Sequence, residues 1–222
     1  MPTALIIGAS RGIGQEFVRQ LRAAGWKVIA TARSDDALQT LKDEGAEALR
    51  LDVLNPESLA GLGWQLDDEK LDLAVYVSGF YGSGGQATSP PTAEDFDQVM
   101  RTNVLGAMQA IPLVAPLVEA RQGRFVFISS GMGSIGEAES SHGWVYRASK
   151  AALNMAVKSA SFDYPKATLV AMNPGWVKTD MGGPDAPTSV QDSVAGMLKV
   201  IAGLGPEHSG SFQSYDGRSF AW

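Results

Sequence analysis

Hydrophobic and polar positions follow two alternating patterns along the chain. Short, mainly apolar runs such as residues 3–7 and 168–172 are typical of strands buried on both faces of a sheet. After the first run, Phe17 and Leu21 recur at helical spacing until Gly25 ends the segment. The pattern therefore predicts strands that alternate with helices.

The predicted elements fit one α/β domain over residues 1–222. We expect strands at residues 3–7, 27–31, 48–51, 71–77, 124–129, 168–172 and 211–214. We expect helices over residues 12–24, around 38–41, from 56 onwards, and over 94–120, 144–160 and 190–204, with Pro112 and Pro116 kinking the 94–120 helix or shifting its register. The alternation predicts a single doubly wound, Rossmann-like parallel sheet with helices on both faces.

Composition narrows the classes of function. A formal net charge of −6 and a pI of about 4.9 argue against nucleic acid as a partner. The absence of cysteine excludes disulfides, thiolate catalysis and zinc–sulfur sites, and the two histidines, His142 and His208, are too few for a metal cluster. The opening apolar run is too short for a signal peptide and no run reaches membrane-spanning length, so we expect a cytoplasmic protein without a membrane partner.

A glycine-rich turn follows the first strand. In a doubly wound sheet, ligands bind beyond the carboxyl ends of the strands, and Gly8, Gly12 and Gly14 occupy the first such turn. The helix that follows offers free N–H groups and a positive dipole end to a pyrophosphate. We predict a dinucleotide site that also includes Ser10, Arg11 and Ile13; a plain tight turn is the alternative.

The end of the second strand selects the dinucleotide. NAD sites place a carboxylate there, whereas a 2′-phosphate requires cations. Arg33 follows the strand, and Arg11 in the glycine loop can reach the same phosphate, while Asp35 and Asp36 come later, in the loop. The residues favour NADP (NADPH), with a merely solvated Arg33 as the alternative.

Tyr146 and Lys150 are four residues apart on the predicted 144–160 helix, and they therefore share one face with Cβ atoms about 6 Å apart. An ammonium stabilises a phenolate, so we expect Tyr146 to titrate closer to neutral pH and to exchange a proton with a carbonyl or alcohol oxygen. The pair alone can arise by chance, and the glycine loop gives it weight.

The glycine loop and the Tyr-x-x-x-Lys segment together resemble the short-chain dehydrogenase/reductase family, and the resemblance runs the length of the chain. Further matches are Asp52-Val53 after the third strand, Asn103 in Arg-Thr-Asn-Val-Leu-Gly, Ile128-Ser129-Ser130, Gly79 after the fourth strand, and Asn-Pro-Gly-Trp-Val-Lys-Thr-Asp at 173–180. Within the family, the chain is similar to the branch of Sniffer- and C-factor-type carbonyl reductases.

The resemblance implies a role for each matching residue. Tyr146 would protonate the developing alkoxide, Ser130 would donate a hydrogen bond to the substrate oxygen, and Lys150 would lower the phenol pKa and bind the nicotinamide ribose. Asn103, near a helix start, would hold a proton-relaying water. The cofactor would also meet Asp52 and Val53 at the adenine, Gly79 by close approach, and Pro174, Gly175, Val177 and Thr179 at the nicotinamide side.

The chain departs from the family pattern at three places. Ile7 stands where many members have threonine. Tyr76-Val77-Ser78-Gly79 replaces Asn-Asn-Ala-Gly, so the polar support that asparagine gives the sheet must come from elsewhere. Ser130 lies 16 residues before Tyr146, a longer gap than in many members, and Ser134, 12 residues before it, is the rival serine. We prefer Ser130 because it ends the buried strand.

Two classes of function remain. The first is an NADPH-dependent oxidoreductase for a small or medium, apolar carbonyl or alcohol substrate; the second is a dinucleotide-binding signalling or regulatory protein with little turnover. We expect the substrate to meet apolar side chains on the loops, namely Phe80, Tyr81, Met132, Trp144, Trp176 and Met181. We also expect a homodimer or homotetramer packed through the 94–120 and 144–160 helices, and apolar residues 220–222 docked on the body or on a partner subunit.

Overall fold

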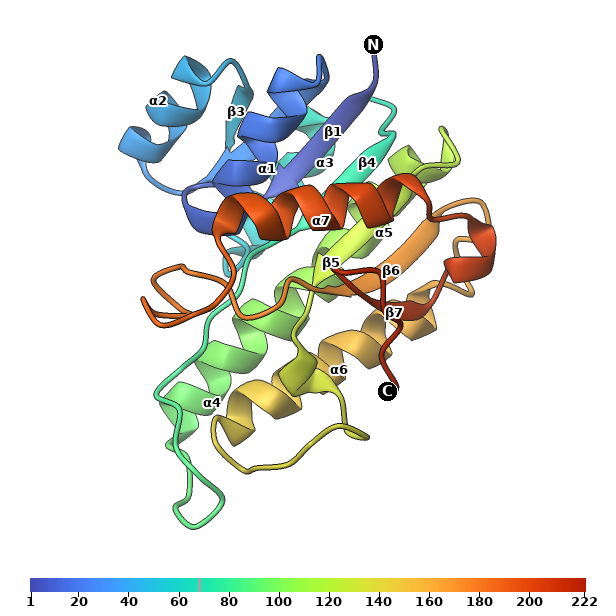
Figure 1. Cartoon of the computed structure of the whole chain (residues 1–222). Helices are drawn as coiled ribbons and strands as arrows, with labels where there is room; N and C mark the ends of the chain where they lie inside the picture. The colour runs from blue at the N-terminus through green and yellow to red at the C-terminus, as the bar shows by residue number, and fades with distance from the viewer. Residues whose placement is uncertain (68) are drawn as a thin grey trace.

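The computed structural model describes residues 1–67 and 69–222, which form a seven-stranded sheet with helices on both faces (Figure 1). The strands are β1 (Thr3–Ile7), β2 (Lys27–Ala32), β3 (Glu47–Arg50), β4 (Leu73–Tyr76), β5 (Arg124–Ile128), β6 (Thr168–Asn173) and β7 (Ser211–Ser214). They lie in the order β3-β2-β1-β4-β5-β6-β7, and every neighbouring pair is parallel. The doubly wound parallel sheet is confirmed, and its order reverses between β1 and β4, where such sheets bind ligands.

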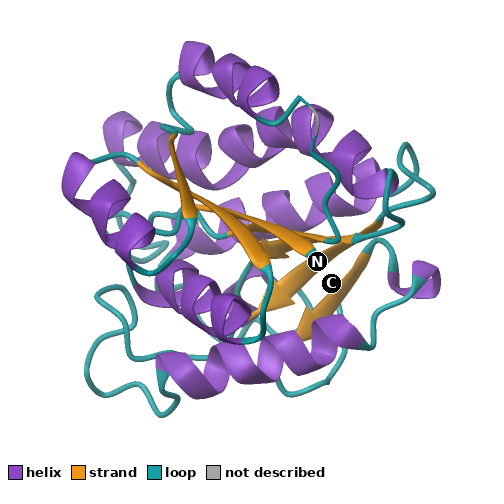
Figure 2. Cartoon of the chain, turned by 90° about the horizontal axis from the view of Figure 1, so that it is seen from above, coloured by secondary structure: helices purple, strands orange, loops and turns teal. Residues whose placement is uncertain are grey.

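Each face of the sheet has its own helical layer (Figure 2). Helices α1 (Gly12–Ala23), α2 (Asp35–Asp43) and α7 (Val190–Ala202) bury apolar side chains on the face that carries Ala4 and Ile6. Helices α3 (Pro56–Gln65), α5 (Gly106–Glu119) and α6 (Trp144–Ala160) cover the face that carries Leu5 and Ile7. Successive side chains of a strand point to opposite faces, so two covered faces require the unbroken apolar runs of the sequence.

The predicted 94–120 helix is two α-helices joined by a π-helical turn. Helix α4 (Ala93–Met100) passes through a π-helical turn at Arg101–Leu105 and continues as α5. The register therefore shifts in this turn, and α5 runs on as an α-helix through Pro112 and Pro116. Both prolines lie on the exposed side of α5, where solvent can reach the carbonyls that lose their hydrogen bonds.

The other boundaries differ by a few residues at most. The third strand begins one residue earlier than predicted, and β4 is shorter than 71–77 because its ends turn into loops. Asp35 and Asp36 lie in the first turn of α2 instead of a loop, since Ser34 caps that helix. None of the helices in the described residues is long and apolar enough to cross a membrane.

The last residues of the chain fold back on its own body. Ser219 pairs with Gln213 in an antiparallel bridge, and the Phe220 ring lies 4.8 Å from that of Phe212. The backbone N–H of Gly136 donates to the Trp222 carbonyl at 3.0 Å. Of the two docking places expected for residues 220–222, the structure shows the body of the same chain.

Candidate functional site

The glycine loop takes a conformation that excludes side chains. Gly8 has φ +90°, and a Cβ there would lie 2.5 Å from the Ser78 hydroxyl oxygen. A Cβ on Gly14 would lie 2.2 Å from the Gly8 carbonyl oxygen. The loop is held by Thr31 of β2, whose hydroxyl accepts from the Gly8 N–H at 3.1 Å and whose carbonyl accepts from the Ala9 N–H at 2.8 Å. Thr31 thus supplies the polar support that Ile7 cannot give.

The N-terminus of α1 lacks both a side-chain cap and an acidic residue in the first turn, as do those of α5 and α6. Helices α2, α3, α4 and α7 each begin with a side-chain cap and carry an acidic residue in the first turn. Helix α1 has neither; its N-cap residue is Arg11, whose side chain caps no N–H group. Free N–H groups and an unopposed positive dipole are the features that bind a phosphate, so the chain fits a dinucleotide at this turn.

The predicted 2′-phosphate arginines differ in their surroundings. Arg33 is exposed directly after β2, and no ion pair involves it within residues 1–67 and 69–222. Arg11 pairs with Asp180 at 2.8 Å, with both side chains about three-quarters exposed. This exposed pair is worth little and can open, so Arg11 remains a candidate for the phosphate.

Asp52 and Val53 lie just beyond β3, as the sequence predicts. One Asp52 carboxylate oxygen accepts from the Leu54 N–H at 3.0 Å and shapes the local turn. Val53 is buried, and its side chain lies against Gly106, where an added Cβ would come within 3.1 Å of the Val53 Cβ. Val53 therefore connects the predicted adenine side of the site to the start of α5.

Tyr76 links the end of β4 to the π-helical turn. Its buried hydroxyl donates to the Thr102 carbonyl at 3.1 Å. The Val77 and Ser78 N–H groups both donate to the Ile7 carbonyl, at 2.8 and 3.2 Å. These bonds support the strand end that the family holds with asparagine.

Asn103 occupies the π-helical turn and is fully buried, not near a helix start as predicted. Its amide oxygen accepts from the Phe80 N–H at 2.7 Å, and its amide nitrogen donates to the Phe80 carbonyl and to the Ser149 hydroxyl at 2.8 and 2.9 Å. Ser149 in turn donates to the Tyr146 carbonyl at 2.8 Å. Asn103 thus fastens the loop after β4 to the helix that carries Tyr146.

Tyr146, Ser130 and Lys150 come together at the ends of β4 and β5. The Ser130 side chain, in the loop after β5, lies close enough to the Tyr146 hydroxyl to lower the pKa of that phenol. The Lys150 ammonium lies 5.5 Å from the centre of the Tyr146 ring and donates to the Ile128 carbonyl at 2.8 Å. A Cβ on Gly79 would lie 3.6 Å from this ammonium, so Gly79 keeps the approach to it open.

Burial shifts the pKa values of Tyr146 and Lys150. It raises the pKa of the Tyr146 phenol, while the Ser130 side chain opposes the rise and the neighbouring Tyr81 adds to it. Burial lowers the pKa of Lys150 to about 8. The structure does not show the expected shift of the Tyr146 pKa towards neutral pH, because loss of water outweighs the partners of the phenol.

Ser134, the rival serine, forms hydrogen bonds away from Tyr146. Ser134 is buried, donates to the Ala221 carbonyl at 2.8 Å and accepts from the Glu137 N–H at 3.2 Å. It therefore holds the loop to the C-terminal residues, whereas Ser130 faces Tyr146. Sequence spacing does not distinguish these two roles, since both serines precede Tyr146 in the sequence.

Asn173 joins the loops after β5 and β6, a role that the sequence interpretation leaves unassigned although the residue opens the Asn-Pro-Gly motif. Its side-chain oxygen accepts from the Gly131 and Gly175 N–H groups at 3.0 and 3.2 Å. The next residue, Pro174, is fixed through its carbonyl by the Ser193 hydroxyl at 2.6 Å. These bonds tie the predicted nicotinamide-side residues to the loop after β5.

Val177 and Thr179 continue from this motif towards the glycine loop. A Cβ on Gly12 would lie 3.4 Å from the Thr179 methyl group, so the two loops face each other across the predicted phosphate site. Val177 is buried and bridges to Thr188. The structure thus brings the N-terminal and C-terminal halves of the predicted cofactor site together.

The aromatic side chains predicted for the substrate pocket divide into two groups. The Tyr81 ring lies 4.8 Å from that of Tyr146 and 6.4 Å from that of His142, at the mouth of the site. Trp176 and Met181 are about half exposed on the loop after β6. The Tyr81 ring therefore lies beside Tyr146, and two apolar side chains on the loop after β6 are exposed.

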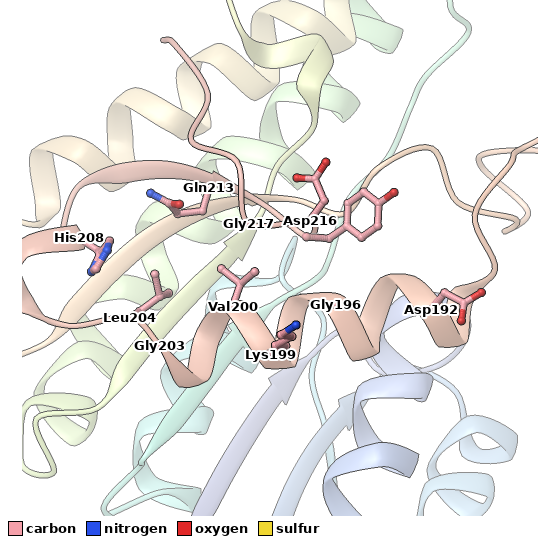
Figure 3. Close-up of a pocket in the computed structure, with 11 residues that line it drawn as sticks. Asp192, Gly196, Lys199, Val200, Gly203, Leu204, His208, Gln213, Asp216 and Gly217 are labelled. Atoms are coloured by element: carbon pink, nitrogen blue, oxygen red, sulfur yellow. The ribbon is translucent and has the colours of Figure 1, made fainter.

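A separate cavity of about 520 Å³ lies between α7 and the end of β7 (Figure 3). Its lining includes Lys199, His208, Tyr215 and Asp216, none of which is in the predicted site. The Tyr215 ring divides the two regions, because a Cβ on Gly175 would come within 2.7 Å of it. The cavity thus lies behind the predicted nicotinamide-side residues and not on the Tyr146 side.

Comparison with known proteins gives concordant matches. The family model described as short chain dehydrogenase matches residues 2–189. The C-signal protein of Myxococcus xanthus is 44% identical over 134 residues, covering 58% of this chain and 81% of that protein. The carbonyl reductase Sniffer of D. melanogaster superposes with a TM-score of 0.91 at 28% identity, over all of both chains. The NADPH-bound carbonyl reductase from chicken fatty liver gives 0.89 at 31% identity, over 100% of this chain and 99% of that one.

Proposed function

The chain belongs to the short-chain dehydrogenase/reductase family, and on that premise we propose that it is an NADPH-dependent carbonyl reductase for small or medium, apolar substrates. The observation that carries the proposal is the placement of the Ser130 side chain next to the Tyr146 hydroxyl, beside the buried ammonium of Lys150. A module that only binds a dinucleotide has no need of that serine. The NADPH-bound chicken carbonyl reductase supports the choice of cofactor and substrate class.

The residues that would hold NADPH come from five loops, those after β1, β2, β3, β4 and β6. The free N–H groups at the start of α1, with Gly8, Ser10, Gly12, Ile13 and Gly14, would bind the pyrophosphate. Arg11 and Arg33 would bind the 2′-phosphate, and Asp52 and Val53 the adenine. Gly79, Pro174, Gly175, Val177 and Thr179 would enclose the nicotinamide, which supplies a hydride when bound.

The chain's own groups would manage the proton and the developing charge. Tyr146 would donate its phenolic proton to the substrate oxygen, and Ser130 would donate a hydrogen bond to the same atom. Lys150 would bind the nicotinamide ribose and replenish the proton, since its pKa of about 8 allows exchange near neutral pH. Both amide hydrogens of Asn103 are used within the protein, so a relay water would bind its amide oxygen or its backbone carbonyl.

Steady-state NADPH oxidation tests the proposal. Aldehydes, ketones and quinones are offered in turn to the wild type and to Tyr146→Phe, while NADPH binding is titrated separately. We expect turnover of at least one carbonyl class by the wild type only, with similar NADPH binding by both. An NADPH-binding wild type that reduces none of them would overturn the enzyme reading.

A signalling or regulatory role is the second candidate, favoured by the 44% identity to C-signal over part of the chain. The same experiment separates the two: binding of NADPH without turnover would support the second. The intact Ser130, Tyr146 and Lys150 favour the enzyme.

We also propose a homodimer or homotetramer formed through α4, α5 and α6. These helices pack on one another and leave large apolar side chains exposed: Phe96, Leu105, Met108 and Met155 are 41–65% exposed. Exposed apolar groups of this size favour association. Sedimentation of the wild type and of Met108→Glu tests this, and a monomeric wild type would contradict it.

A further inference from the structure

The ends of β2 and β3 bring together charges that the predicted 2′-phosphate site does not include. Arg50, the last residue of β3, is paired in register with Ala32, the residue before Arg33. The Arg50 guanidinium donates to the Arg33 carbonyl and forms an ion pair with Asp35. One side chain thus ties the turn after β2 to the neighbouring strand.

The Arg50–Asp35 ion pair affects what Arg33 can bind. Asp35 is two residues from Arg33, and its carboxylate is the nearest in sequence to the Arg33 guanidinium. The structure directs this carboxylate to Arg50 instead, and the described residues contain no ion pair to Arg33. The bond to the Arg33 carbonyl also fixes the backbone from which the Arg33 side chain extends.

We propose that Arg50 is a positioning residue for cofactor preference: it holds Asp35 away from Arg33 and so leaves Arg33 available for the 2′-phosphate of NADPH. The proposal rests on the proposed function, since it requires a bound NADPH. It assigns Arg50 no contact with the cofactor. Its effect is specific to the phosphorylated dinucleotide, because NADH has no group for Arg33 to bind there.

Binding titrations with Arg50→Gln test the proposal without any turnover. The dissociation constants of NADPH and NADH are measured by quenching of intrinsic fluorescence or by calorimetry. We expect the NADPH constant to rise about threefold to fivefold, the scale of one exposed ion pair, and the NADH constant to change by less than about twofold. Lys42→Gln, which removes an exposed cation from α2, is the control for the change in net charge and should leave both constants almost unchanged.

A second variant shows whether Arg50 acts through Asp35. Asp35→Asn alone should leave NADPH binding unchanged or tighter. In the Asp35→Asn background, Arg50→Gln should cost less than about twofold, because the carboxylate that Arg50 binds is already gone. Melting temperatures measured alongside verify that each variant is folded.

Three results would overturn the proposal. The first is an equal loss of NADPH and NADH affinity in Arg50→Gln. The second is an undiminished NADPH loss in the Asp35→Asn background, which would mean that Arg50 acts on the cofactor directly. The third is a wild type that binds NADPH no more tightly than NADH. That result would overturn the proposed cofactor itself, and it can be told apart from the other two because it is measured without any variant.

Discussion

Removing the Tyr76 hydroxyl perturbs the contact that replaces the family's asparagine support. Tyr76→Phe keeps the buried ring but removes the donor to the Thr102 carbonyl in the π-helical turn. Leaving a carbonyl without its partner costs about 1–2 kcal/mol. For a chain of this length, 1 kcal/mol lowers Tm by roughly 2–4 °C, so we expect a fall of about 2–8 °C.

Gly106 provides a coupled test of the same contact. A Cβ there would lie 2.5 Å from the Tyr76 hydroxyl oxygen and 3.1 Å from the Val53 Cβ, so Gly106→Ala should cost about 1–3 kcal/mol by overpacking. Tyr76→Phe removes the nearer of these atoms. The double variant should therefore lose less stability than the sum of the single losses, by about 0.5 kcal/mol or more.

Urea unfolding followed by circular dichroism measures these free energies. Tyr164→Phe is the matched control, because the described residues offer no hydrogen-bond partner to the Tyr164 hydroxyl; its effect should stay within about 0.5 kcal/mol. A Tyr76→Phe variant as stable as the control, or strictly additive losses with Gly106→Ala, would refute the account of this contact.

Three further predictions concern the cofactor, the buried lysine and the active serine. Arg33→Ala should raise the NADPH dissociation constant about tenfold or more and leave that of NADH nearly unchanged; equal losses would contradict the cofactor assignment. Because burial lowers the pKa of Lys150 to about 8 from its ordinary 10.5, the folded chain binds this proton less tightly than the unfolded chain, so this group makes the free energy of unfolding rise between pH of about 8 and 10.5. Lys150→Met should lose that rise in urea titrations, and an identical pH slope in both proteins would contradict the assignment. Ser130→Ala should lower kcat about a hundredfold, whereas Ser134→Ala should lower Tm with kcat within about threefold; the reverse pattern would make Ser134 the active serine.

The fold could be predicted from the sequence because it depends on local burial patterns. Strands covered on both faces need unbroken apolar runs, and these runs marked all the strands found in the described residues to within a few positions. The π-helical turn at 101–105 could not be predicted from the sequence, since one extra residue in a helix leaves the apolar spacing almost intact.

The site was predictable only where it is a short motif. Thr31 and Tyr76 compensate for missing family residues through partners 23 and 26 positions away, and such pairs appear only when the strand order is known. The protonation of Tyr146 depends on the ring of Tyr81 and on the loss of water around it, which spacing to Lys150 does not reveal.

The most direct measurement of the central claim is the turnover number of the wild type and Tyr146→Phe on one reducible carbonyl compound, with NADPH affinity measured on the same samples. The account predicts a loss of at least about a hundredfold in kcat and an NADPH dissociation constant within about threefold of wild type, since the hydroxyl supplies the proton. A variant that reduces the carbonyl compound at the wild-type rate would contradict it.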